Sequence, residues 1–182
     1  MQHKRYDISV EDLRQLISYN PDTGKLLWLP RPLKFCKSER EQSRWNSRCA
    51  GKFVSTPDAF GYLRFKLFNI LYKEHRVCWA LYYGEWPPQN MHIDHINNNT
   101  SDNRIQNLRL ATPSENSMNQ GKPRAGTSRF KGVYWDRKAD KWVSKIMREG
   151  HYTHLGFFLT EEDAYLAYCQ AGKDLHGEFF HP

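Results

Sequence analysis

The chain has 182 residues, and its 27 lysines and arginines outnumber its 20 aspartates and glutamates, which gives a formal net charge of +7. Hydrophobic residues make up 39% of the chain and aromatic residues 14%, a composition that excludes a disordered polymer and leaves room for one domain or two small ones. No stretch approaches the roughly 20 apolar residues that span a bilayer, and the polar start lacks the apolar centre of a signal peptide, so we expect neither a membrane protein nor one secreted by that route.

A short helix and a strand are expected in the first thirty residues. Ser9 fits the N-cap of a helix that would bury one apolar stripe, formed by Leu13, Leu16 and Ile17. Turn-forming residues at 20–24 then separate this helix from a strand at 25–29.

Residues 31–52 form a basic stretch, with seven lysines and arginines against two glutamates, interleaved with Phe35 and Trp45. A second basic stretch, 119–148, holds nine basic residues against two acidic ones. Such stretches suit a polyanion, because lysine and arginine bind phosphates and release condensed counterions. Either stretch alone is equally well explained as a solvated surface, but two in one small chain favour nucleic acid.

Between these two stretches lie a predicted strand and a predicted helix. In 61–68, apolar and basic side chains alternate, which predicts a half-buried strand with Arg64 and Lys66 on one exposed face, where they are candidate DNA contacts. From about 73 to 83 the apolar residues follow a helical period, and Gly84 fits the end of that helix.

The segment 92–119 carries the clearest chemistry. Two short strands are expected at 92–96 and 104–110, joined by an asparagine-rich loop. A helix then begins at Thr112, with Pro at the first helical position and Glu at the third, which is a complete capping box. The predicted order is therefore strand, loop, strand, helix.

Asp94, His95 and Asn116 form a candidate site for phosphodiester cleavage. This reaction needs oxygen ligands for a divalent cation and a base that activates water. Asp94 and Asn116 can supply the oxygens, which favour Mg²⁺ or Mn²⁺ over Zn²⁺, and His95 can supply the base. Neighbouring side chains of a regular strand point to opposite faces, so we expect the strand to break at Asp94 and His95 if both serve one site.

These residues resemble the HNH endonucleases, in particular the phage and intron-encoded homing type. The resemblance covers about 60–119 and rests on His-Ile-Asp-His-Ile-Asn-Asn-Asn at 92–99, Asn-Leu-Arg-Leu-Ala-Thr at 107–112 and Ser-Glu-Asn at 114–116. It implies a ββα-metal fold that cuts DNA with one divalent metal ion.

The resemblance also assigns roles to four residues. It implies that Asp94 and Asn116 bind the metal ion, that His95 is the general base, and that Asn107 holds the loop that carries this base. The third motif residue of the family is often His, and the asparagine found here fits the homing members that use Asn at that place.

Several polar residues nearby have simpler explanations. A lone Asp-His pair is more often structural than catalytic, and only its spacing to Asn107 and Asn116 favours catalysis. His75 and Arg76 either brace the ββα unit or contact DNA, and His92 fits a structural or phosphate contact better than a metal ligand. Three asparagines are assigned to turn formation: Asn98, Asn99 and Asn103.

The last fifty residues predict three strands followed by one helix. The expected strands are 130–135, 141–148 and 152–158. The helix begins after Thr160 with three acidic residues in its first turn, buries one stripe of mostly small apolar residues, and ends at Gly177.

This segment resembles the APETALA-type DNA-binding domain of plant ethylene-response factors. The resemblance rests on Gly132-Val133, Lys141-Trp142, Leu155-Gly156-Phe157 and the run 161–168. It implies that the sheet lies in the major groove of DNA with the helix packed behind it. By position, the DNA-binding face would contain Lys131, Tyr134, Arg137, Lys145, Met147, Tyr152 and His154. Several plant arginines and a tryptophan are replaced, so the target sequence does not carry over.

The sequence thus predicts an α+β protein with two modules. Its expected parts are an HNH endonuclease domain at 1–118, made of an N-terminal α/β extension (1–72) and a ββα-metal core (73–118), a linker at 119–129, and an APETALA-type domain at 130–182 with a small three-stranded antiparallel sheet and one helix.

The predicted function is site-directed cleavage of double-stranded DNA, with a nick or a double-strand break left open. The main alternative is a non-catalytic DNA-binding regulator that uses the HNH-like unit as a scaffold, and a weaker one is a nonspecific defence nuclease. Double-stranded DNA is the expected partner, with no membrane, no protein partner and a monomeric chain. If the gene is phage-encoded, we expect the protein in the cytoplasm of the bacterial host.

Overall fold

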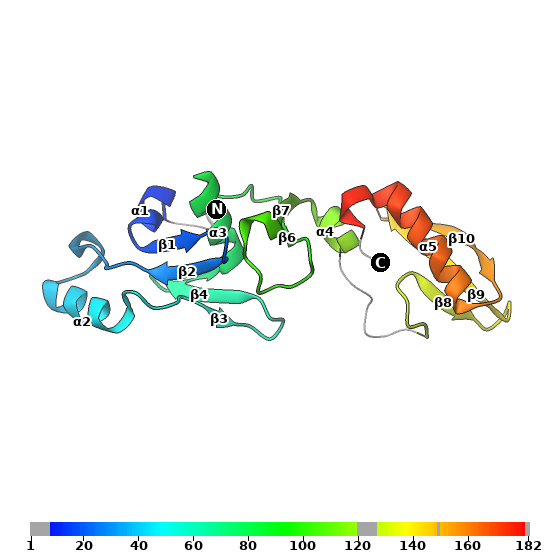
Figure 1. Cartoon of the computed structure of the whole chain (residues 1–182), viewed down its shortest axis with the longest axis horizontal. Coiled ribbons are helices and arrows are strands. Elements are labelled where there is room, and N and C mark those ends of the chain that lie inside the picture. The colour runs from blue at the N-terminus through cyan, green and yellow to red at the C-terminus, as the bar shows by residue number, and fades with distance from the viewer. Residues whose placement is uncertain (1–7, 120–126, 149, 181–182) are drawn as a thin grey trace, which may run out of the picture. The chain divides into compact units, whose positions relative to one another are not determined.

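The computed structural model describes residues 8–119, 127–148 and 150–180. The chain divides into two compact units, Met1–Leu110 and Ala111–Pro182 (Figure 1). Both mix helices with small antiparallel sheets, so the α+β prediction is confirmed. Among the described residues, none of the helices has the length and apolar character needed to cross a membrane.

The first unit begins with helix α1 (Val10–Arg14), in which the Ser9 hydroxyl accepts the N–H of Asp12 at 3.0 Å. A hairpin of β1 (Ile17–Asn20) and β2 (Lys25–Trp28) follows. The predicted helical stripe was partly wrong, because the helix ends at Arg14 and Ile17 pairs with Trp28 in the hairpin. Leu13, Leu16 and Ile17 are all buried as expected, but Leu13 lies in the helix, Leu16 in a turn and Ile17 in a strand.

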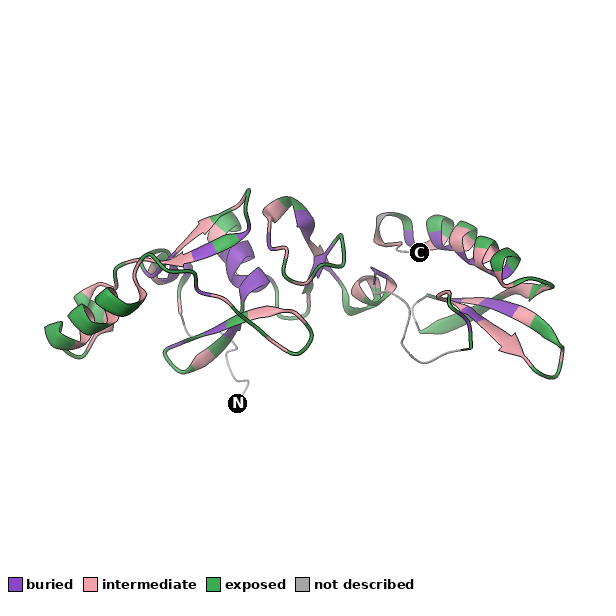
Figure 2. Cartoon of the chain, turned by 60° about the horizontal axis from the view of Figure 1, so that its bottom comes forward, coloured by how far each residue is buried: buried purple, intermediate pink, exposed green. Residues whose placement is uncertain are grey.

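Helix α2 (Glu39–Cys49) lies in the first basic stretch and was not predicted. Its N-terminus is capped by Ser38, whose hydroxyl accepts the N–H of Glu41 at 3.2 Å, and the Glu41 carboxylate accepts the N–H of Lys37 at 2.7 Å. All residues of α2 are described, and each is exposed or half-buried, as Figure 2 shows. Apolar periodicity therefore gave no signal, and only the capping residues would have revealed the helix.

A three-stranded antiparallel sheet follows, with the order β3 (Thr56–Pro57), β4 (Leu63–Leu67) and β5 (Ile70–Lys73). The predicted alternation in β4 is confirmed, because Phe65 and Leu67 are buried while Arg64 and Lys66 are exposed.

Helix α3 (Glu74–Tyr83) is the centre of the first unit and is buried along most of its length (Figure 2). It ends at Gly84, whose φ of 83° favours glycine. The hydrophobic core around it draws residues from distant segments, among them Leu13, Leu16, Leu26, Phe65, Tyr72, Val77, Ile93 and Leu108.

Strands β6 (His92–His95) and β7 (Leu108–Ala111) form a two-stranded sheet. The second strand starts later than predicted, because Ile105–Asn107 form a 3₁₀ turn. Helix α4 (Pro113–Asn119) has the predicted capping box: the Thr112 N–H donates to the Glu115 carboxylate at 2.7 Å, and the Glu115 N–H donates to the Thr112 hydroxyl at 3.2 Å. The order strand, strand, helix is as predicted, but α4 belongs to the second unit, so the ββα-metal packing stays a prediction.

The second unit contains an antiparallel sheet of β8 (Val133–Asp136), β9 (Lys141–Arg148) and β10 (His151–Phe158), with β9 in the middle. Helix α5 (Glu161–His176) packs on this sheet, and the Thr160 hydroxyl caps it by accepting the N–H of Asp163. Gly132 permits the close packing, because a Cβ at this residue would lie 2.1 Å from the ring of Tyr168. The predicted three strands and helix are confirmed, and residues 120–126 of the predicted linker lie outside the described residues.

Candidate active site

Asp94 and His95 are the last two residues of β6, and both are almost fully buried. Our expectation that the strand breaks at this dipeptide was wrong, because the strand runs through His95 before the chain turns. The two side chains accordingly contact different partners, Arg109 and Asn103. Both residues lie near Tyr62. The centre of the Tyr62 ring lies 5.9 Å from that of the His95 ring. Burial together with the negative charge of Asp94 raises the pKa of Tyr62.

The Asp94 carboxylate forms a buried ion pair with Arg109 of β7. The Nε and Nη2 atoms of Arg109 each lie 2.8 Å from the same oxygen of Asp94. Arg109 lies inside the motif at 107–112, and no role was predicted for it. Arg109 thus balances the charge of Asp94 in this structure, and the role of Asp94 as a metal ligand stays a prediction.

The imidazole of His95 is held by Asn103. His95 Nε2 lies 3.0 Å from Asn103 Oδ1, and the two residues are 4% and 1% exposed. Because a carbonyl oxygen only accepts hydrogen bonds, this contact makes Nε2 the protonated nitrogen and Nδ1 the nitrogen that can accept a proton. Burial lowers the pKa of His95, although the hydrogen bond with Asn103 opposes this effect. His95 is therefore neutral at pH 7, as a general base must be.

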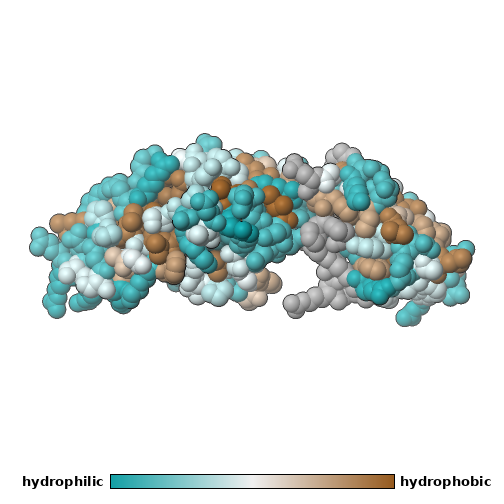
Figure 3. Space-filling model, in the orientation of Figure 1, coloured by the Kyte–Doolittle hydropathy of each residue, from teal (hydrophilic) through white to brown (hydrophobic). Residues whose placement is uncertain are grey.

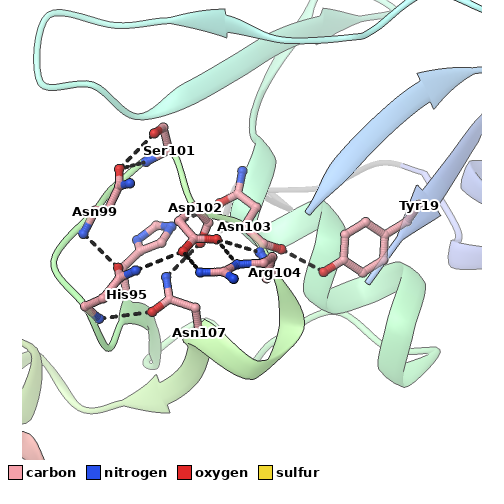
Figure 4. A network of polar contacts seen from close by, with 9 residues as sticks. Tyr19, His95, Asn99, Ser101, Asp102, Asn103, Arg104 and Asn107 are labelled. Carbon is pink, nitrogen blue, oxygen red and sulfur yellow. Dashed lines mark hydrogen bonds and ion pairs between the residues drawn. The ribbon is translucent and has the colours of Figure 1, made fainter. Parts of the chain in front are cut away.

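Asn103 was wrongly assigned to the turn alone. Its backbone carbonyl accepts a hydrogen bond from the Tyr19 hydroxyl at 2.7 Å, so the residue lies between β1 and His95 (Figure 4). Its amide also lies close to the buried carboxyl group of Glu74: burial raises the pKa of Glu74, and hydrogen bonding by Ser55 and Asn103 opposes the rise. No local pattern predicts this, because its partners come from segments far apart in the sequence.

His75 and Arg76 of α3 are buried and support the site from behind. The His75 ring packs edge-on against the His95 ring at 5.2 Å, and burial holds the pKa of His75 well below 6.5. Arg76 donates to the backbone carbonyls of Pro87 and Met91, both at 3.0 Å. Of the two roles left open for Arg76, bracing the segment before β6 is the one that the structure shows. His92 is exposed at the start of β6.

Asn107 connects both ends of the loop that follows His95. Its Oδ1 accepts the N–H of Asn97 at 3.0 Å, and its Nδ2 donates to the carbonyl of Asp102 at 2.8 Å (Figure 4). Within the loop, Arg104 pairs with Asp102 and lowers the pKa of its carboxyl group to about 2. Asn107 therefore lies where a residue that holds the loop must lie, and its role in catalysis stays a prediction.

Asn116, the second predicted metal ligand, lies on α4 in the second unit, and its sharing of an ion with Asp94 stays a prediction. Among the described residues, no group of three or more His, Cys, Asp or Glu side chains is placed to hold a metal ion. The predicted pair of one carboxylate and one amide does not need such a group. Its oxygen donors fit a hard ion such as Mg²⁺ or Mn²⁺, which keeps several water ligands.

Arg64 and Lys66 belong to a basic strip on the exposed face of β4 and β5. Its third member, Lys73, was not predicted and lies opposite Arg64 in the sheet. The Lys73 ammonium lies 4.9 Å from the centre of the Tyr62 ring, and Tyr62 contacts His95. The strip of Arg64, Lys66 and Lys73 thus leads along the sheet to the candidate site.

In the second unit, three of the predicted DNA-binding residues come together. The Lys145 ammonium lies 4.9 Å from the Tyr134 ring and 4.5 Å from the Tyr152 ring. Three further predicted residues are exposed, namely Arg137, Met147 and His154. Lys131 differs, because its ammonium donates to the backbone carbonyl of Met118 at 2.6 Å and burial lowers its pKa. It is therefore engaged with α4 in this structure.

The chain is similar in sequence to known HNH endonucleases. A family model described as HNH endonuclease matches residues 72–118. The chain is 32% identical over 116 residues to "Protein 3.8" of Escherichia phage T7, which covers 63% of this chain and 93% of that protein. It is 33% identical over 110 residues to "Uncharacterized HNH endonuclease L560" of Acanthamoeba polyphaga mimivirus, which covers 59% of this chain and 55% of that protein. No solved structure matches the chain.

Proposed function

Because the chain belongs to the HNH endonuclease family, a nuclease family that acts on DNA, we propose that it is a metal-dependent, site-directed endonuclease of the homing type for double-stranded DNA. The observation that carries the proposal is the placement of His95 at the end of β6: a neutral imidazole held by Asn103 and followed by a loop that Asn107 fixes.

His95 is the general base in this proposal. Its Nδ1 accepts a proton from a water molecule, and the resulting hydroxide attacks the phosphorus atom of the scissile phosphodiester. Asp94 and Asn116 would hold a divalent ion, which when bound stabilises negative charge on the phosphate and on the leaving oxygen. Asn107 keeps the loop after His95 in place, so that the imidazole stays oriented during the reaction.

Asn103 acts as a positioning residue for this base. Its amide oxygen faces Nε2 of His95 at 3.0 Å, so Nε2 keeps its proton and Nδ1 remains the basic nitrogen. The buried carboxyl group of Glu74 lies near the same amide.

DNA binding would involve both units. The basic strip of Arg64, Lys66 and Lys73 supports a path for the phosphate backbone toward Tyr62 and His95. For the second unit we propose an APETALA-type DNA-binding domain. Its sheet with one packed helix and its grouping of Lys145 with two tyrosines support this assignment, because a cation between aromatic rings can bind phosphate while the rings contact sugars.

Nicking of supercoiled plasmid DNA tests the activity. Plasmids carrying a library of the source's genomic DNA are incubated with the protein and Mg²⁺ or Mn²⁺, and cut sites are mapped. His95→Ala should reduce cleavage by about 10²–10⁴-fold while DNA binding is retained, because the general base is lost. His92→Ala is the matched control, since it removes an exposed histidine of the same strand.

The outcomes also separate the alternatives. Specific binding without any nicking by the wild type would identify a regulator and refute the endonuclease. Equal cleavage of unrelated plasmids, unchanged by deletion of 130–182, would identify a nonspecific nuclease instead.

A further inference from the structure

The exposed face of α2 consists of arginines and serines, with one acid at its N-terminal end. Spacings of three and four residues place Arg40, Ser43, Arg44, Ser47 and Arg48 on one side of the helix, and all five are exposed. We call this set the α2 arginine face. Glu39 in the first turn is the exposed acid that borders it. The surface over α2 is mostly hydrophilic, at the lower left of Figure 3.

The inner face of α2 attaches the helix to the rest of the first unit. The Trp45 ring packs edge-on against Trp28 at 5.3 Å, and the guanidinium of Arg31 lies 4.0 Å over Trp45. Gln42 donates to the carbonyl of Arg31 at 2.9 Å, and Asn46 accepts the N–H of Arg31 at 2.7 Å. An isolated helix of 11 residues is marginal in water, so these contacts keep the arginines in a fixed array.

The three arginines of this face, Arg40, Arg44 and Arg48, form no ion pair with the residues that the structure describes. Like charges four residues apart weaken a helix, so the array is unfavourable for folding alone. A negatively charged partner removes this repulsion.

We propose that the α2 arginine face binds the phosphate backbone of duplex DNA, as a separate anchoring surface of the first unit. The proposal rests on the proposed function, in which duplex DNA is the substrate. Arginine binds phosphate through two parallel hydrogen bonds, and the small serines between the arginines let the backbone approach closely. From Arg40 to Arg48 the helix rises about 12 Å, which matches the rise of three to four nucleotides of one strand.

The position of α2 gives this surface a distinct task. In Figure 1, α2 lies at the end of the first unit opposite to β6 and β7, which carry the candidate active site. DNA bound by the α2 arginine face would therefore be held away from the scissile phosphate. Contacts to phosphates position a protein on DNA without reading sequence, so this surface contributes affinity to any duplex.

Salt-dependent binding of the full-length protein tests the proposal. The triple variant Arg40→Gln, Arg44→Gln, Arg48→Gln is compared with wild type on a labelled 30-base-pair duplex, without divalent ions, between about 50 and 200 mM salt. The slope of log K against log salt should become shallower by about 2–3, because each lost phosphate contact removes about 0.9, and affinity near 0.1 M salt should fall on the order of 10²-fold. The same loss is expected on an unrelated duplex.

A matched variant with lysine at the three positions should keep the slope, because the charge is retained. Circular dichroism checks folding, and if the triple variant does not fold, Arg44→Gln alone should reduce the slope by about 0.9. An unchanged slope in a folded glutamine variant would show that the face is only solvated or serves another partner, and would overturn the proposal. If the slope falls but no duplex is ever cut, the DNA-binding surface stands while the proposed endonuclease activity fails.

Discussion

Replacing Asn103 with leucine removes the amide between His95 and Glu74 without leaving a large cavity. The side chain is 1% exposed, so the substitution does not touch the protein surface. Leucine has the same number of side-chain heavy atoms but accepts no hydrogen bond, so the Nε2 hydrogen of His95 loses the Asn103 oxygen. The contact of Tyr19 with the backbone of residue 103 is retained.

The structure sets the size of the effect. A stranded buried polar group costs about 1–3 kcal/mol, so the free energy of unfolding should fall by about that amount. Loss of the tautomer preference alone has a small effect on the rate, because the tautomer with a basic Nδ1 stays populated. Misplacement of the unsupported ring adds more, since an error of about 1 Å can cost on the order of 10². We therefore expect cleavage to slow by about 10–100-fold with unchanged DNA affinity.

Two measurements check this reasoning. Single-turnover cleavage at saturating protein gives the rate, and ¹⁵N NMR of the histidine side chains reports which nitrogen of His95 carries the proton. Asn99→Ala is the matched control, because Asn99 is exposed in the same loop and its side chain bonds only within the turn, to Ser101. A leucine variant that cuts at the wild-type rate with His95 in an unchanged tautomer would refute the positioning role of Asn103.

Two further predictions follow from buried charges. Arg109→Leu removes the arginine that pairs with the buried Asp94 carboxylate, so the free energy of unfolding should fall by about 3–5 kcal/mol. Thermal melting should show partial rescue by Mn²⁺, and absence of rescue would contradict an ion site beside Asp94. Because the pKa of His75 lies well below 6.5, the unfolded chain binds a proton that the folded protein excludes, and stability should fall below pH 6.5 by up to about 1.4 kcal/mol per pH unit. Urea unfolding at pH 7.5 and 5.5 measures this loss, which His75→Phe should reduce.

Local sequence signals predicted the elements with strong periodicity or complete caps. The alternation of 61–68, the capping box at Thr112 and the acidic first turn of α5 each depend on neighbouring residues, and each element formed where expected. Helix α2 was missed because a half-buried helix with a single tryptophan has no apolar stripe.

The environment of the candidate base was harder to predict. The family motif pointed to His95 and Asn107, but it does not say what fixes the imidazole. That depends on Tyr19 from β1, Glu74 from α3 and Asn103 from the loop, which meet only when the core has formed. The prediction that the strand breaks at Asp94 and His95 also failed. The two residues are adjacent in the sequence, but Asp94 contacts Arg109 and His95 contacts Asn103.

The supports of His95 connect the candidate site to the stability of the whole first unit. The His75 ring that packs on His95 belongs to α3, and α3 forms the centre of the hydrophobic core. The polar groups around His95 are buried, and away from water a satisfied hydrogen bond gains strength and an unsatisfied one is costly. A substitution that loosens the packing of α3 should therefore disturb the orientation of the base before it unfolds the protein. Cleavage rate is thus expected to be more sensitive than the melting temperature to small changes in this core.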